Sequence, residues 1–101
     1  MNMQIELSLN DNIKNIQLEI EPLKIDSSNN YNIQLKNLTP YDFIIQECQV
    51  KDQNGYLQVL NSPKEVEGNG TQDINILISI PKSANSPLKG NVSIKGYFII
   101  K

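Results

Sequence analysis

The stretch TQDINILISI, residues 71–80, decides the fold class of this chain. Isoleucine occupies every second position from Ile74 to Ile80, and the alternate positions are polar except for Leu77. Successive side chains of a strand point to opposite faces, so this spacing places the four isoleucines on one side, facing a core. We therefore predict a half-buried β-strand with Leu77 as an outward apolar exception.

The period of two continues over the rest of the chain. Alternating segments are separated by clusters rich in Asn, Asp, Gly and Pro, which are typical of turns. The expected strands are Gln4–Leu9, Ile16–Glu21, Tyr31–Lys36, Phe43–Lys51, Tyr56–Leu60, Thr71–Ile80 and Gly90–Lys101. No useful window has the apolar spacing of an amphipathic helix. The pattern predicts an all-β fold, an antiparallel β-sandwich of about seven strands, in one domain spanning residues 1–101.

Two strands carry more detailed expectations. On Phe43–Lys51 the shared parity places Ile44, Cys48 and Val50 on one face, which makes Cys48 a buried, inert thiol rather than a reactive one. The following DQNG (52–55) predicts a hairpin turn, because Asn-Gly accepts positive φ at low cost. On the last strand, the residues expected to face the core are Val92, Ile94, Phe98 and Ile100.

The composition argues against several classes of function. The chain has no His, no Trp and no Arg, and all nine basic residues are Lys. Without His there is no Ser-His or Cys-His nucleophile pair and no imidazole metal ligand. Without Arg, and with a net charge of −2, the chain lacks the bidentate clamps and basic stripe typical of nucleic-acid binding. We expect no enzymatic activity, cofactor, metal, small-molecule substrate or nucleic-acid partner; an enzyme would have to use Asp, Glu, Lys, Tyr or a bound metal.

Origin and compartment are indicated only indirectly. Ile and Asn are the commonest residues, which with Lys as the only base indicates an AT-rich genome: a virus, a mobile element, or a bacterial or archaeal microbe. The longest apolar runs are far shorter than the ~20 residues of a membrane-spanning helix, so no membrane span is expected. The first residues lack a secretory signal, so the default expectation is the cytoplasm. If an upstream signal was removed, or the protein is viral, the expectation becomes a surface or virion location.

Several motifs have both a functional and a structural interpretation. The acidic and amide turns NDN (10–12) and DQNG (52–55) could bind a hard cation, but turns of this composition are common without one. The pattern Asn-X-Ser/Thr occurs at Asn37, Asn69 and Asn91 and would matter only in an exported protein.

The second half of the chain resembles known families of sandwich domains. NIQLKN (32–37), PKEVEG (63–68) and DINILISIP (73–81) resemble immunoglobulin-like (fibronectin III-like) accessory domains of microbial surface proteins. NLTP (37–40) and IKG (94–96) also resemble the water-stress, late-embryogenesis-abundant type 2 sandwich. Both resemblances imply a non-enzymatic sandwich, and neither supplies catalytic residues.

The C-terminal YFII (97–100) is apolar on both parities. If Phe98 faces the core, Tyr97 and Ile99 point outward, and with Leu77 they would form a small protein-contact patch. The alternatives are a loop folding over the patch or ordinary surface. We therefore expect a binding or structural module that acts through a protein partner or as a homo-oligomer, of the accessory, envelope or virion-subunit kind. The alternative function is stress protection of the late-embryogenesis-abundant type 2 class.

Overall fold

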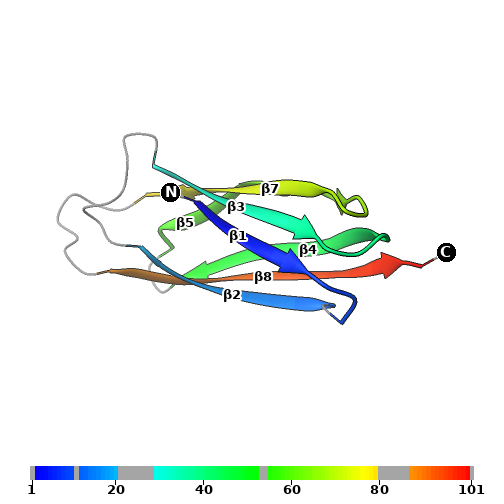
Figure 1. Ribbon diagram of the computed structural model, residues 1–101. Coiled ribbons are helices and arrows are strands. Elements are labelled where there is room, and N and C mark those ends of the chain that lie inside the picture. Colours follow the sequence, from blue (N-terminus) through cyan, green and yellow to red (C-terminus); the bar gives the residue numbers. More distant parts are fainter. Residues whose placement is uncertain (1, 11, 21–28, 53–54, 80–86, 101) are drawn as a thin grey trace.

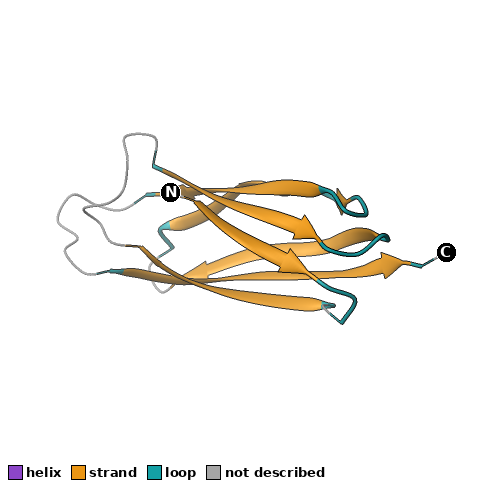
Figure 2. Cartoon of the chain, in the orientation of Figure 1, coloured by secondary structure: helices purple, strands orange, loops and turns teal. Residues whose placement is uncertain are grey.

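The computed structural model describes residues 2–10, 12–20, 29–52, 55–79 and 87–100. These residues form eight strands and no helix (Figures 1 and 2). The strands are β1 (Asn2–Leu7), β2 (Ile13–Ile20), β3 (Asn30–Asn37), β4 (Asp42–Asp52), β5 (Leu57–Asn61), β6 (Glu65–Val66), β7 (Thr71–Ile78) and β8 (Leu88–Ile99). The all-β prediction is confirmed, with eight strands instead of about seven. Nothing in the described part of the chain forms a helix that could cross a membrane.

The strands alternate strictly between two sheets. The odd-numbered strands form sheet A in the order β1-β3-β7-β5, and the even-numbered strands form sheet B in the order β2-β8-β4-β6. No two consecutive described strands are therefore hydrogen-bonded neighbours. The hairpin predicted at Asp52–Gly55 is wrong for this reason, because β4 ends in sheet B whereas β5 joins β7 in sheet A. The positive φ of the turn is confirmed at Gly55, where φ is 70°.

One pair departs from the antiparallel prediction. β1 runs parallel to β3, from Asn2 opposite Asn32 to Leu7 opposite Asn37, whereas every other described pair is antiparallel. Figure 1 shows the two arrows pointing the same way. The parallel pair arises because β2 crosses to sheet B and returns the chain to the start of β3. In the immunoglobulin constant arrangement one sheet takes the first, second, fifth and fourth strands, an order different from that of sheet A.

The inner faces of the two sheets meet in one core that is aliphatic except for Phe43. Ile74, Ile76 and Ile78 of β7 are buried, as the alternation predicts, and Ile80 lies outside the described residues. The other buried apolar side chains are Leu7, Ile16, Leu18, Ile20, Ile33, Leu35, Phe43, Ile45, Leu57, Val66, Leu88, Val92 and Ile94. Both sheets contribute to this cluster, so the fold is sandwich-like.

A β-bulge in β4 reverses the predicted facing of its first half. Phe43 and Ile45 are buried, the register shifts between Ile45 and Glu47, and beyond it Cys48 and Val50 pack against the core. One extra residue in a strand exchanges its two faces. The prediction that Ile44 shares a face with Cys48 and Val50 is therefore wrong, and Ile44 lies on the outer face.

The last strand follows its prediction except at the end. Val92 and Ile94 are fully buried and Phe98 packs partly against the core, whereas Ile100 follows the end of β8 and is 66% exposed. The inward position between them is Gly96, where an added Cβ would overlap the Ile44 carbonyl oxygen and lie 2.6 Å from Cζ of Phe43. Glycine is therefore required where β8 passes beneath the Phe43 ring.

Candidate protein-contact surface

The three residues predicted to form a contact patch lie on two different surfaces. Tyr97 and Ile99 are 45% and 39% exposed on the outer face of sheet B. Leu77 is half-buried on the outer face of sheet A, between Asn30 and Gln58 on the neighbouring strands. The structure does not bring Leu77 together with the other two, because β7 and β8, although consecutive, belong to different sheets. Of the loop 81–87 that could cover the patch, only Pro87 lies within the described residues.

Two isoleucines from other strands take the place expected for Leu77. Ile44 lies opposite Tyr97 on β4, and Ile13 lies opposite Lys95 on β2, diagonal to Tyr97. Ile13 is 59% exposed, and a hydrogen bond of 2.9 Å from the Gly96 amide to the Asn12 carbonyl holds the start of β2 beside β8. We call Ile13, Ile44, Tyr97 and Ile99 the apolar strip.

Neither isoleucine is expected on this surface from the alternation of the sequence, for identifiable reasons. The alternation predicts that Ile44 faces the core with Cys48 and Val50, because the bulge that turns Ile44 outward leaves no signal in the sequence pattern. Ile13 precedes the stretch expected as a strand, although its odd parity, opposite to that of Ile16 and Leu18, could have indicated an outward position.

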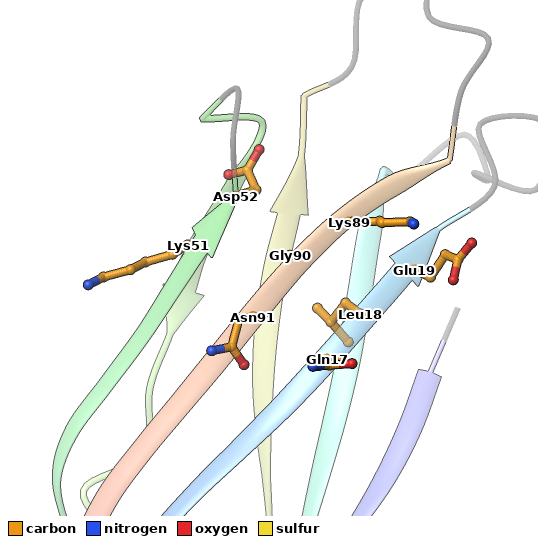
Figure 3. Close-up of a pocket in the computed structure, with 8 residues that line it drawn as sticks. All are labelled: Gln17, Leu18, Glu19, Lys51, Asp52, Lys89, Gly90 and Asn91. Atoms are coloured by element: carbon orange, nitrogen blue, oxygen red, sulfur yellow. The ribbon is translucent and has the colours of Figure 1, made fainter.

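The remainder of the outer face of sheet B is polar. Cross-strand rows of side chains follow one another away from the strip: Asn15, Ser93 and Gln49; then Gln17, Asn91 and Lys51; then Glu19 and Lys89. At the far end is an open hollow of about 780 Å³, lined by Gln17, Leu18, Glu19, Lys51, Asp52, Lys89, Gly90 and Asn91 (Figure 3). Apart from Leu18 and Gly90, the lining consists of amide and oppositely charged side chains, and none of the eight residues is aromatic.

A buried asparagine organises the loops between the sheets. Asn37 is 1% exposed, and its Nδ2 donates to the carbonyl oxygens of Tyr41 at 2.7 Å, Val66 at 3.1 Å and Glu67 at 3.2 Å. Its Oδ1 accepts from the amide of Thr39 at 3.0 Å and from the Thr39 hydroxyl at 2.8 Å. The Asn-X-Thr pattern at this position is therefore structural, since the amide nitrogen that a glycan would need is buried and engaged.

The other sequence candidates have ordinary structural environments. The Asp52 carboxylate accepts from the amides of Tyr56 at 2.8 Å and Leu57 at 3.3 Å, as in a capped turn; Gln53, Asn54 and Asp11 lie outside the described residues. No group of three or more His, Cys, Asp or Glu suited to a metal occurs within the described ranges. Burial raises the pKa of the Cys48 thiol, and a hydrogen bond with Ser62 opposes part of that shift.

The apolar strip thus exposes three large apolar side chains on one sheet face, whereas the polar side chains of Asn37 and Asp52 are engaged in hydrogen bonds with neighbouring turns. Comparison of the chain with protein-family models, with characterised proteins and with solved structures found no match.

Proposed function

We propose that the protein is a non-enzymatic binding module that binds a partner protein through the apolar strip. Its fold would be an immunoglobulin-like sandwich in the sense that its sequence resembles such domains. The observation that carries this proposal is the exposure of Ile13, Tyr97 and Ile99 on one end of an otherwise polar sheet face. Covering apolar surface contributes about 25 cal/mol per Å², so such a strip favours a partner that excludes water from it.

The residues around the strip define the chemistry of the partner. Lys95 of β8 lies opposite Glu47 of β4 on one side and Ile13 of β2 on the other, and Glu65 of β6 lies opposite Ile44. An apolar centre with a charged rim is the usual anatomy of a protein interface, and Tyr is enriched at such centres. The partner surface would present apolar side chains to Tyr97 and basic side chains toward Glu47 and Glu65.

The test compares two double variants of the full chain in affinity capture from cells of the source organism. Tyr97→Ser with Ile99→Lys disrupts the strip, and the control Asn91→Ser with Gln17→Lys makes similar changes on the polar part of the same face. Circular dichroism verifies that both remain β-structured. The proposal predicts a protein retained by the parent and the control at equal levels and lost from the strip variant. Equal retention by all three would refute it, as would loss from both variants alike.

A further inference from the structure

Among the described strands, four lie at a sheet edge and have a neighbouring strand on one side only. They are β1 and β5 in sheet A and β2 and β6 in sheet B. Such edges pair readily with other strands, and proteins usually protect them with bulges, prolines, very short strands or inward-pointing charges. The four edges can therefore be compared by asking which of these devices each one carries.

Three of the edges are protected. β5 has a register shift between Val59 and Asn61, and β6 has only two residues and follows Pro63 closely. β2 is longer, but Lys14 occupies the same parity as the buried Ile16 and therefore places a charge on the core side of the edge.

β1 carries none of these devices. Its six residues pair with β3 without a register shift, contain no Pro or Lys, and place Met3, Ile5 and Leu7 on the core side. Within the described residues no strand pairs with its other side. Leu7 is fully buried, but Met3 and Ile5 are only half-buried, so the unpaired side retains apolar surface to cover.

We propose that β1 pairs antiparallel with β1 of a second copy of this chain, joining the two A sheets into one continuous sheet. The partner is a second copy of this chain because a twofold axis brings the same strand, β1, together with itself. Each free backbone donor of one β1 edge then lies opposite a free acceptor of the other. The inference concerns a surface separate from the apolar strip and does not depend on it.

The register of this contact follows from the burial pattern. In a continuous sheet, residues that lie opposite each other on the two β1 strands must point to the same face of the sheet. The twofold axis therefore passes through a residue position, and near the middle of β1 that residue is Gln4 or Ile5. At Gln4, each half-buried Met3 lies opposite Ile5 of the partner subunit, and Glu6 lies opposite the uncharged position 2. At Ile5, Met3 would lie opposite Leu7, which has no exposed surface left to cover. The Gln4 register therefore buries more apolar surface and brings no like charges together.

Side chains on the outer face support the same register. Gln4 Nε2 donates to Gln34 Oε1 at 3.0 Å across β1 and β3. With the axis at Gln4, this row of amides continues into the partner subunit, where Gln4 meets its own symmetry mate. Two symmetry-related glutamine side chains can hydrogen-bond to each other across a twofold axis, because each amide carries both a donor and an acceptor.

The first experiment measures cross-linking of the full chain in a Cys48→Ser background. Gln4→Cys should form a disulfide-linked dimer under mild oxidation, because directly opposed strand residues lie within the roughly 4.4–6.8 Å Cα separation of a disulfide. Gln17→Cys, an exposed position on the β2 edge strand, is the matched control and should react only by random collision. Cross-linking of Gln4→Cys no faster than that of Gln17→Cys would overturn the proposal.

The second experiment measures association by analytical ultracentrifugation. The parent should dimerise at high micromolar concentration, and Met3→Lys, which copies the inward charge of β2, should weaken dimerisation at least about tenfold. The strip variant Tyr97→Ser with Ile99→Lys should dimerise like the parent, which separates this proposal from the proposed function. A monomeric parent, or a Met3→Lys variant that is folded by circular dichroism and dimerises as strongly as the parent, would refute pairing through β1.

Discussion

Replacing Asn37 should destabilise the fold more than any other polar substitution on the described strands. Its side chain makes five hydrogen bonds that join the end of β3 to the Thr39–Tyr41 loop and to the β6–β7 turn. Asn37→Ala removes the amide and leaves three carbonyl oxygens and the Thr39 amide to find new partners. The control is Asn91→Ala, at an exposed position on β8.

The expected magnitude follows from these contacts. Each net hydrogen bond contributes about 1 kcal/mol, so five would contribute about 5 kcal/mol if all were lost without replacement. Nδ2 has two hydrogens for three carbonyls, and three of the five bonds are buried while two are only partly buried, so water recovers part of the loss. We expect about 3–4 kcal/mol for Asn37→Ala, a large fraction of the roughly 5–15 kcal/mol typical of a whole domain. Asn91→Ala should stay within about 0.5 kcal/mol.

Urea unfolding followed by circular dichroism measures both values. Asn37→Asp tests the direction in which stability changes with pH, because a carboxylate would face the carbonyl oxygens of Tyr41, Val66 and Glu67. The charged form is disfavoured there, so the pKa of the introduced group would be raised above its unfolded value of about 3.9. The free energy of unfolding of this variant, relative to the parent, is then greatest below the unfolded pKa of about 3.9 and decreases as the pH rises through the folded pKa. A cost below about 1 kcal/mol for Asn37→Ala, or a pH-independent gap for Asn37→Asp, would refute the reasoning.

Four further outcomes are expected. Gly96→Ala should cost about 1–3 kcal/mol or more in urea unfolding, since its Cβ meets the Ile44 carbonyl and the Phe43 ring; a neutral result would contradict that close approach. Cys48 should react with a thiol reagent more slowly than free cysteine at pH 7, and faster as pH rises, because burial raises its pKa; a rate equal to that of free cysteine would contradict its burial. Refolding in stopped-flow experiments should take milliseconds to seconds, because every described strand pair is non-local, and a microsecond phase that recovers all the signal would oppose this. In freezing or drying assays the chain should protect a labile enzyme no better than an inert protein does, whereas clear protection would favour the late-embryogenesis-abundant type 2 interpretation.

The positions of seven of the eight described strands, all except the two-residue β6, and most of their inward faces could be predicted from the sequence. Ile74, Ile76 and Ile78 are buried because alternation and apolar burial are local properties of one strand. The same logic correctly places Val92 and Ile94 in the core. Tyr97 and Ile99 occupy the alternate positions of the same strand and are exposed for the same reason.

Which strands become neighbours was decided only by the tertiary structure. Backbone donors and acceptors are alike in every strand, so alternation does not specify a pairing partner. The consequences appear at Leu77, which the crossing between sheets separates from Tyr97, and at Ile44, which the bulge in β4 turns toward Tyr97. The apolar strip and the unprotected β1 edge thus arise from non-local pairing, whereas the faces of the individual strands arise from the order of residues along the chain.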